Sequence, residues 1–270
     1  MNEKLNDLND KEWVNFTNTI WETDYCHDDT WFLRKKLKTT KSPYVMRDII
    51  KFFTKRGERV LDIFAGTGST LLGAEMCGRE AVGIELYPKW CGLFESIRTK
   101  FNICNGDLVK NAEKYKDSNQ IISRMINDDC LNRMKALKSN YVDAVICDPP
   151  HGAGHTHIND APERIQKKDF GNLSTQEEFY DRMLTVGQEV HRVLRDDKYW
   201  VIMMGDRYKN NEFVPVSSIL ADKLREVGFQ LKGIKVWWNK SGMNSLKPYS
   251  VGQSFVPNIV HNNIIIMRKI

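Results

Sequence analysis

Arg59-Val60-Leu61-Asp62-Ile63-Phe64-Ala65-Gly66-Thr67-Gly68 is the stretch that decides the fold, because an apolar strand runs directly into a turn that holds two glycines. Glycine adopts backbone angles that are strained for other residues, so this turn can bend sharply and lie close to a bound molecule. A helix is predicted over residues 69–77, before Gly78. Strand, glycine turn and helix in this order are typical of open α/β sheets, whose ligands bind beyond the carboxyl ends of the strands.

The chain after residue 43 alternates between predicted strands and predicted helices. Strands are predicted over residues 59–63, 81–85, 125–127, 142–147 and 199–204. Helices are predicted over residues 43–53, 69–77, 175–194 and 216–227. One further helix is predicted to begin near residue 88, and another to end at residue 137. This alternation predicts a mostly parallel sheet covered on both faces. Two further apolar runs, 231–238 and 264–267, have no helix signal between them, which predicts antiparallel neighbours at one edge of the sheet.

The second informative motif is Asp148-Pro149-Pro150-His151, which follows the apolar run 142–147. An exocyclic amine of adenine or cytosine is a poor nucleophile, because its lone pair is conjugated into the ring. The Asp148 carboxylate and the Pro149 carbonyl can accept both amine hydrogens and so favour a tetrahedral nitrogen with a free lone pair. The prolines keep that carbonyl rigid, and His151 can stack on a base flipped out of a duplex. The alternative is a stiff turn that only ends the strand.

Two further strand ends carry carboxylates that could contact a bound nucleoside. Glu85 lies 19 residues after Gly66 and can accept hydrogen bonds from both hydroxyls of a ribose. Asn127-Asp128-Asp129 follows the next strand, where a side chain can reach an adenine amino group. This spacing does not separate a dinucleotide from S-adenosylmethionine, although the incomplete GxGxxG pattern disfavours a pyrophosphate. The alternatives are a turn without a ligand, an exposed strand end at Glu85 and a helix cap at Asp129.

Charge is distributed unevenly along this chain of 270 residues, whose formal net charge is +5. Residues 1–30 carry eight acidic and two basic residues, whereas residues 31–60 carry ten basic and two acidic ones. The densest basic run is 34–41, and no acidic residue occurs over 227–270. Basic runs are often only solvated faces, but two of them in one small chain favour a partner with a phosphate backbone. No run approaches about 18 consecutive apolar residues, which argues against a membrane span.

The six cysteines show no CxxC pairing, and several lie in apolar segments. This pattern favours reduced thiols over a disulfide framework or a zinc cage. The N-terminus is polar and lacks the apolar core of a signal peptide, so a cytoplasmic location is expected. His151, His155 and His157 lie close in sequence, but no acidic or cysteine partner shares a convincing spacing. We therefore predict no metal site.

Over residues 40–270 the sequence resembles the N6-adenine and N4-cytosine DNA methyltransferases. Lys41-Ser42-Pro43-Tyr44 and the helix after it look like the family segment that helps to hold the methionine part of the cofactor. Residues 62–70 are similar to the family's Asp-Pro-Phe-Ala-Gly-Ser-Gly-Thr-Thr, with Ile63 in place of proline. Asp148-Pro149-Pro150-His151 is similar to the catalytic Asp-Pro-Pro-Tyr, with His151 in place of an aromatic ring. Histidine stacks less strongly and can titrate near neutral pH.

The resemblance implies S-adenosylmethionine as the cofactor. It also implies a Rossmann-like methyltransferase fold, with a mostly parallel seven-stranded sheet that has an antiparallel edge strand. Cofactor-binding roles are implied for Asp62, Phe64, Ala65, Gly66, Thr67, Gly68, Ser69, Thr70, Glu85, Asp128 and Pro43. Catalytic roles are implied for Asp148, Pro149, Pro150 and His151.

The expected organisation is an N-terminal arm, residues 1–40, followed by one catalytic domain, residues 41–270. Relatives with the cofactor motif first usually carry a separate target-recognition domain, but the gaps in this chain are too short to hold one. Residues 105–120 are expected to form a surface insertion. Recognition of the target sequence would then come from the predicted loops 151–173 and 239–261, from the arm or from a partner. Docking onto the main domain is the expected role of the arm's tryptophans, Trp13, Trp21 and Trp31.

The expected activity is site-specific DNA methylation, as in restriction-modification systems. Adenine N6 is favoured slightly over cytosine N4, because Asp rather than Ser opens the catalytic motif. Methylation of an RNA base at guanine N2 or adenine N6 is an open alternative. So is a non-catalytic subunit that binds nucleic acid and supports an active partner. A homodimer, or a specificity or nuclease partner, is equally left open. An oxidoreductase would leave Asp148-Pro149-Pro150 without a role.

Overall fold

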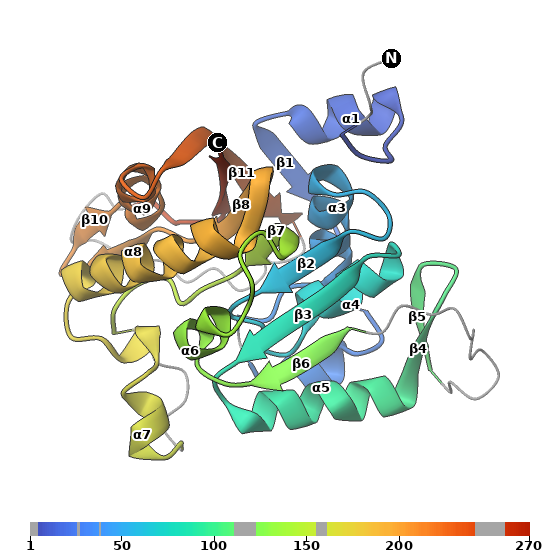
Figure 1. Cartoon of the computed structure of the whole chain (residues 1–270), viewed down its shortest axis with the longest axis horizontal. Coiled ribbons are helices and arrows are strands. Elements are labelled where there is room, and N and C mark those ends of the chain that lie inside the picture. The colour runs from blue at the N-terminus through green and yellow to red at the C-terminus, as the bar shows by residue number, and fades with distance from the viewer. Residues whose placement is uncertain (1–4, 26–27, 38, 111–122, 155–160, 241–256) are drawn as a thin grey trace.

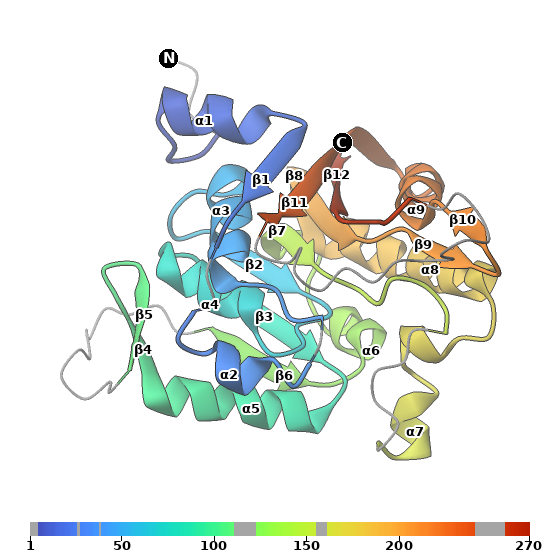
Figure 2. The same ribbon diagram turned by 180° about the vertical axis from the view of Figure 1, so that it is seen from behind.

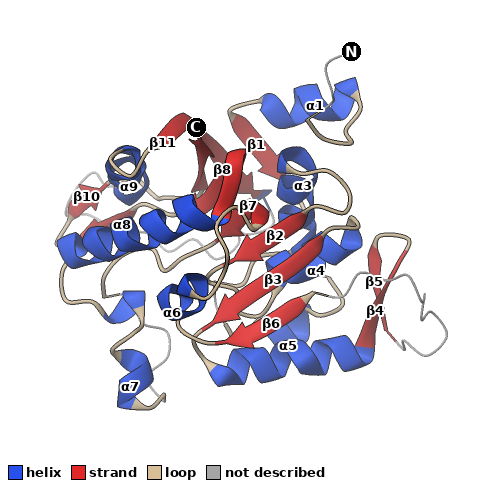
Figure 3. Cartoon of the chain, in the orientation of Figure 1, coloured by secondary structure: helices blue, strands red, loops and turns tan. Residues whose placement is uncertain are grey.

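The sheet at the centre of the molecule has eight strands in the order β1-β11-β12-β8-β7-β2-β3-β6 (Figure 1). The computed structural model describes residues 5–25, 28–37, 39–110, 123–154, 161–240 and 257–270. Helices pack on both faces of the sheet (Figure 3). The predicted fold class, a mostly parallel α/β sheet covered on both faces, is therefore confirmed.

The bounds of the main elements follow the predicted ones closely. This agreement arises because β7 is buried at all six positions, whereas α3 has buried residues at helical spacing. The strands are β1 (Ile20–Thr23), β2 (Arg59–Asp62), β3 (Glu80–Glu85), β6 (Arg124–Asn127), β7 (Val142–Cys147), β8 (Leu194–Met204), β11 (Phe229–Asn239) and β12 (Asn262–Lys269). The helices are α1 (Asp10–Thr17), α2 (Trp31–Arg34), α3 (Pro43–Phe53), α4 (Ser69–Met76), α5 (Pro88–Lys100), α6 (Cys130–Lys135), α8 (Gln176–Val193) and α9 (Val216–Arg225).

Two hydrophobic clusters, one on each face of the sheet, form the core. On one face α6, α8 and α9 cover the strands, with Met183 and Leu220 among the fully buried side chains. On the other face α3, α4 and α5 do the same with Ile49, Leu71 and Phe94. Because both faces are covered, the central strands read as continuous apolar runs rather than alternating ones.

The antiparallel strand does not lie at the edge of the sheet, which corrects its predicted position. β12 lies between β11 and β8 and runs antiparallel to both. Outside β11, the arm adds a further strand, because β1 pairs in parallel with Val236–Asn239. The sheet therefore has eight strands rather than the expected seven. β1 has four residues, of which only Thr23 is buried, so it lacks the alternating pattern that predicts a strand.

Two segments predicted as loops contain short elements. The smaller elements are β4 (Phe101–Cys104), β5 (Asp107–Lys110), α7 (Glu163–Gln166), a 3-10 helix (Phe170–Asn172), β9 (Arg207–Lys209) and β10 (Glu212–Val214). The predicted surface insertion thus begins in the β4–β5 hairpin, and the predicted long loop contains a short helix. Residues 111–122 and 155–160 of these segments, and residues 241–256 of the predicted loop 239–261, lie outside the described residues. None of the described helices is long and apolar enough to span a membrane.

Aromatic side chains dock the N-terminal arm onto the main sheet. Trp13 packs on Phe52 with ring centroids 4.9 Å apart, and the Trp21 ring lies 6.4 Å from that of Trp237. The buried Lys235 ammonium donates hydrogen bonds to two carbonyls of the arm. The expected docking is therefore confirmed for these two tryptophans.

A buried ion pair fixes the end of the arm. The Arg34 guanidinium is fully buried and donates to the buried Asp28 carboxylate. It also donates to the Lys41 carbonyl and to the Ser69 hydroxyl, at 2.8 Å each. α2, which carries Arg34, lies against α5 on the face shown in Figure 2. Arg34 thus connects the arm to the start of α4.

We expect Arg34→Met to lower the free energy of unfolding by about 3–5 kcal/mol, because it leaves the Asp28 carboxylate buried without its cation. Urea unfolding followed by circular dichroism measures this loss. Lys36→Met, at an exposed position of the same arm, is the matched control and should change stability by less than about 0.5 kcal/mol. Adding Asp28→Asn to Arg34→Met should recover part of the loss. An Arg34→Met protein as stable as wild type would contradict this role.

Candidate functional site

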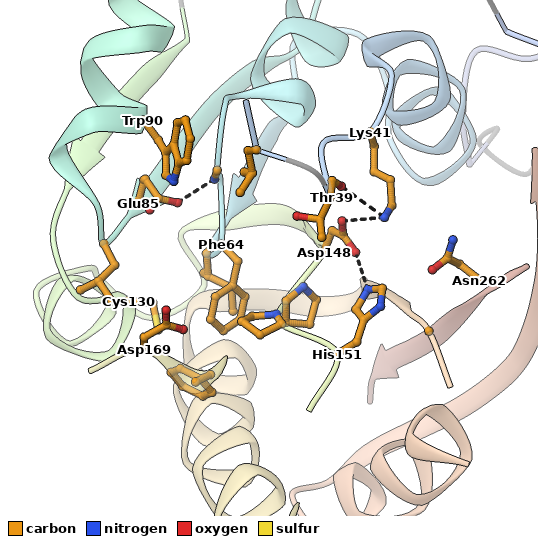
Figure 4. Close-up of a pocket in the computed structure, with 18 of the residues that line it drawn as sticks. Thr39, Lys41, Phe64, Glu85, Trp90, Cys130, Asp148, His151, Asp169 and Asn262 are labelled. Atoms are coloured by element: carbon orange, nitrogen blue, oxygen red, sulfur yellow. Dashed lines mark hydrogen bonds and ion pairs between the residues drawn. The ribbon is translucent and has the colours of Figure 1, made fainter. Parts of the chain in front are cut away.

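The carboxyl ends of β7, β2 and β3 meet at one edge of the sheet, and a cavity of about 820 Å³ opens there (Figure 4). The strand order reverses at this point, since the chain continues to β3 and β6 on one side and to β8 on the other. Such reversals are where open α/β sheets bind their ligands. Predicted site residues that line the cavity are Phe64, Gly66, Glu85, Asp128, Asp148, Pro149, Pro150 and His151.

The other predicted residues lie behind this surface or outside it. Most of them line a smaller adjoining cavity of about 50 Å³, namely Asp62, Ala65, Thr67, Ser69 and Thr70. Gly68 borders neither cavity, and Pro43 is buried at the first position of α3, where its carbonyl packs against Gly73 of α4. A cofactor contact for Pro43 stays a prediction.

The glycine turn after β2 takes its shape from two left-handed residues. Gly66 has φ +51° and Gly68 has φ +85°. A Cβ at Gly68 would lie 2.2 Å from the Phe94 ring, so only glycine fits between the turn and α5. The Gly66 amide donates a 2.7 Å hydrogen bond to Glu85, which ties the turn to the end of β3. The sequence pattern therefore predicted this turn correctly.

Glu85 is the acidic end of β3 and is almost fully buried. One carboxylate oxygen accepts from the Gly66 amide and the other from the Tyr87 amide, both at 2.7 Å. Burial raises the pKa of Glu85 from 4.5 to about 8, although the two amide hydrogen bonds lower it. The Trp90 indole lies beside Glu85 (Figure 4), and its buried N–H has no partner among the described residues. A buried acceptor next to a buried free donor suits the hydroxyls and base of a nucleoside.

Asp62 is the last residue of β2, and its side chain stabilises the glycine turn that follows. Its carboxylate accepts a 2.9 Å hydrogen bond from the Phe64 amide and a hydrogen bond from the Thr70 hydroxyl. Burial raises the pKa of Asp62 from 3.8 to about 7. Thr67 is also held from the arm, because its hydroxyl lies 3.0 Å from that of Thr40. These side chains give the turn a fixed shape on both sides.

Asp148 follows β7 and is held by two partners. Its Oδ2 lies 3.0 Å from the Lys41 ammonium, and its Oδ1 lies 3.1 Å from Nε2 of His151. Burial alone would raise the pKa of Asp148, but Lys41 and His151 together lower it below its ordinary value. Asp148 is therefore an ionised acceptor. Pro149 follows it and also faces the cavity.

His151 has a contact that the sequence did not predict, because its ring bonds to Asp148 as well as facing the cavity. A Cβ at Gly205, just after β8, would lie 2.6 Å from Nδ1 of His151. Gly205 thus leaves room for the imidazole beside the catalytic motif. Figure 4 shows Asn262, at the start of β12, on the side of His151 away from Phe64.

The three polar residues at the end of β6, Asn127, Asp128 and Asp129, have different roles. Asp128 lines the cavity, and the amide of Asn127 donates to the carbonyls of Glu85 and Leu86 at 2.9 and 3.0 Å. Asp129 accepts from the Asn132 amide at 3.1 Å and caps α6, which is the alternative that the sequence left open. Asp128 is therefore the one of the three that remains a candidate for contacting the base of a nucleoside.

Sequence reasoning missed several cavity residues. Lys41 lies in a basic run and in the segment that resembles the family's methionine-holding one, but nothing in its neighbourhood indicated a contact with Asp148. Trp90 lies on α5, and Tyr87 donates from its hydroxyl to Asp169 across the cavity. These contacts join segments far apart in the chain, so local patterns carry no signal for them. The described residues hold no metal-binding cluster of His, Cys, Asp or Glu, and His155 and His157 lie outside them.

The mostly parallel sheet with a cavity at its strand ends is a Rossmann-like arrangement, and the family match identifies its class as methyltransferase. The family model described as DNA methylase, for N6 and N4 methyltransferases, matches residues 2–96 and 142–269, so the chain belongs to the N6/N4 DNA methylase family. The family's cofactor is S-adenosylmethionine, which confirms the predicted cofactor.

Three curated relatives share short stretches with the chain. The type II methyltransferase M.MthZI of Methanothermobacter thermautotrophicus is 36% identical over 80 residues, which are 30% of this chain and 19% of that protein. M.BglI of Bacillus subtilis is 35% identical over 75 residues, 28% of this chain and 21% of that protein. A protein named Probable tRNA (guanine(10)-N2)-dimethyltransferase of Methanothermococcus thermolithotrophicus is 29% identical over 100 residues, 36% of this chain and 53% of that protein. The chain thus spans about a fifth of the length of M.MthZI and of M.BglI.

Solved structures agree on the fold alone. TehB from Haemophilus influenzae aligns with a TM-score of 0.50 and 11% identity, over 91% of this chain and 68% of that one. At this identity the likeness supports the sheet topology and says nothing of the substrate.

The raised pKa of Glu85 predicts that the ligand-free protein loses stability as the pH rises. A carboxyl whose pKa is 4.5 when unfolded and about 8 when folded stabilises the fold fully below pH 4.5, and this contribution is lost as the pH passes through about 8. Glu85→Gln removes that titration. The fall in Tm from about pH 6 to about pH 8.5, measured by differential scanning fluorimetry, should therefore be smaller in this variant.

Glu163→Gln, on the exposed helix α7, is the matched control and should keep the wild-type dependence. Asp62 still titrates in the Glu85→Gln variant, so the dependence should be reduced rather than abolished. Equal pH dependence in wild type and Glu85→Gln would mean that Glu85 stays ionised throughout this range.

Proposed function

We propose that this protein is a site-specific DNA methyltransferase that acts on the exocyclic amine of a flipped base. N6 of adenine is favoured over N4 of cytosine, because Asp148 rather than a serine opens the catalytic motif. The observation that carries the proposal is the placement of Asp148 and Pro149 in the same cavity as the Gly66 turn and Glu85. An amine acceptor and a nucleoside-binding edge are thereby side by side.

The residues present suit S-adenosylmethionine at the β2–β3 edge. When bound, this cofactor supplies an electrophilic methyl group. Glu85 would accept hydrogen bonds from the ribose hydroxyls, and the Trp90 N–H, which has no partner in the described part of the chain, offers a donor nearby. The Gly66 turn would lie against the methionine part, and Asp128 would face the adenine. These roles rest on the donors and acceptors that line the cavity.

Asp148 would orient the amine while keeping its own two partners. A carboxylate has about four lone-pair sites, and Lys41 and His151 occupy one on each oxygen. One amine hydrogen would be accepted by a remaining site and the other by the Pro149 carbonyl. This arrangement aims the nitrogen lone pair at the donor edge of the cavity. Orientation and polarisation by fixed acceptors are then the main sources of rate.

Other parts of the chain support a DNA partner. Leu37, which belongs to the basic run 34–41, lies against the cofactor turn, 3.0 Å from the position of a Cβ on Gly66. Lys168 and Arg207 line the cavity and could meet phosphates at its mouth. The proposed layout is an arm, residues 1–40, and one catalytic domain, residues 41–270. The recognition sequence would be read by loops around the cavity, by a second copy, or by a specificity or nuclease partner.

The proposed location is the cytoplasm, where DNA is accessible and thiols stay reduced. Its support is that the five cysteines in the described part of the chain are all free.

RNA is the second candidate substrate. The observation in its favour is the relative named as a tRNA guanine-N2 dimethyltransferase, because the match covers 53% of that protein but only 19% of M.MthZI. The same acceptor pair, Asp148 and Pro149, would then hold the amine of an RNA base.

We expect Asp148→Ala to lower kcat by about 10²–10³, because the amine loses its charged acceptor. Cofactor affinity should stay close to that of wild type, since Asp148 lies across the cavity from Glu85 (Figure 4). The measurement is mass spectrometry of nucleosides from mixed-sequence DNA and from total RNA, each incubated with protein and S-adenosylmethionine. Isothermal titration gives the cofactor affinity.

Asp129→Ala is a matched control, since it removes a carboxylate of the same cavity that caps α6 and pairs with Arg182 at 3.9 Å. It should cost about 1 kcal/mol of stability and leave kcat nearly unchanged. N6-methyladenine or N4-methylcytosine in DNA would identify the target base, and a product found only in RNA would move the assignment to RNA. An Asp148→Ala protein as active as wild type would exclude the proposed role of this carboxylate.

A further inference from the structure

We propose that Lys41 is a positioning residue for Asp148, and that the arm places it there through Arg34. This inference rests on the proposed function. It assigns to the arm a part in the catalytic apparatus, beyond docking on the sheet.

The contact between Lys41 and Asp148 has the geometry of a fixed ion pair. The ammonium lies 3.0 Å from Oδ2, with side-chain exposures of 11% for Lys41 and 17% for Asp148, so water screens the pair weakly. His151 holds the other oxygen at 3.1 Å. Because each oxygen has its own partner, the carboxylate plane cannot rotate freely. Losing either partner would free that rotation.

The main chain of Lys41 is itself held from two sides. Its carbonyl accepts from the Arg34 guanidinium at 2.8 Å and from the Ser69 hydroxyl at 2.7 Å. Arg34 is in turn fixed by its buried pair with Asp28. The ammonium also donates to the carbonyl of Thr39 at 3.4 Å. The contacts therefore run from the buried pair through Lys41 to Asp148.

A phosphate contact is the competing role for Lys41, and its surroundings argue against it. The Lys41 side chain is mostly buried and directed at a carboxylate (Figure 4). Lys35 and Lys36 of the same run are exposed and make no ion pair within the part of the chain that the structure describes. Those two lysines are better placed to meet a phosphate backbone.

Removing the ammonium should change the titration of Asp148 as well as its orientation. The titratable and charged groups that face Asp148 among the described residues are Lys41, His151, Asp62 and Cys147. Of these, Lys41 is the strongest influence that lowers the pKa of Asp148. Without the Lys41 ammonium, burial raises the pKa of Asp148. As the pH falls, the carboxylate is then protonated at a higher pH than in wild type. A conservative arginine can restore the charge.

The experiment compares wild type, Lys41→Met, Lys41→Arg and the control Lys11→Met, at an exposed position of α1 in the same arm. With saturating DNA and cofactor, kcat is measured from about pH 5 to about pH 9. Lys41→Met should lower kcat by at least about tenfold near pH 6, with a smaller deficit at high pH and an unchanged KM for DNA. Lys41→Arg should recover most of the activity, and Lys11→Met should match wild type in kcat.

A raised KM for DNA with unchanged kcat would overturn the inference in favour of a phosphate contact. A loss of kcat that is equal at every pH and accompanied by a lower Tm would overturn it in favour of a merely structural pair. Carbon-13 NMR titration of aspartate carboxyls, with Asp148 assigned from Asp148→Asn, gives a readout that needs no turnover. An Asp148 pKa that Lys41→Met leaves unchanged overturns the inference. Wild-type protein that forms no methylated nucleoside overturns the proposed function instead.

Discussion

The parallel pairing of β7, β2 and β3 is the constraint on which the rest of the site depends. Parallel neighbours end on the same side, so residues separated by many positions in the chain reach one cavity without any long connection between them. The turn after β2 must then be narrow enough to leave space beside β3. Gly68 keeps the turn narrow because its missing side chain lets the Phe94 ring approach. Gly66 holds the turn beside β3 because its amide donates to Glu85. The proposed nucleoside-binding edge is thus a consequence of strand order and of two residues without side chains.

Local patterns predicted most of this arrangement, and non-local contacts account for what they missed. The six buried residues of β7 and the helical spacing of α3 are written in adjacent positions, so their bounds could be predicted. β1 is four residues long and is stabilised by pairing with β11, more than 200 residues away. The contact of Lys41 with Asp148 likewise depends on where the arm crosses the turn after β2. Neither contact could be predicted from the sequence pattern, because the spacing of apolar residues within one segment does not show which distant segment it will contact.

The arm matters to the site because its last residues contact the turn after β2, Thr40 at Thr67 and Leu37 at Gly66. The family model begins at residue 2, whereas the resemblance read from the motifs begins at residue 40. Burying the Arg34 guanidinium costs desolvation energy that Asp28 must offset, and an isolated surface arm has no reason to carry such a pair. The pair is explained if the position of the Lys41 backbone matters. The arm then belongs to the site for the same reason that the turn does.

Three carboxyl groups, those of Asp62, Glu85 and Asp148, lie at the ends of the three central strands. Burial acts to raise the pKa of each. It raises the pKa of Asp62 to about 7 and that of Glu85 to about 8, since backbone amides and a hydroxyl only partly offset the desolvation. Asp148 is the exception, because a cation lies against it and lowers its pKa. Environments that separate the pKa values of neighbouring acids commonly assign them different tasks. In the proposed function, the two carboxyls with raised pKa values support the nucleoside-binding edge, and the carboxylate paired with Lys41 stays ionised to accept an amine hydrogen.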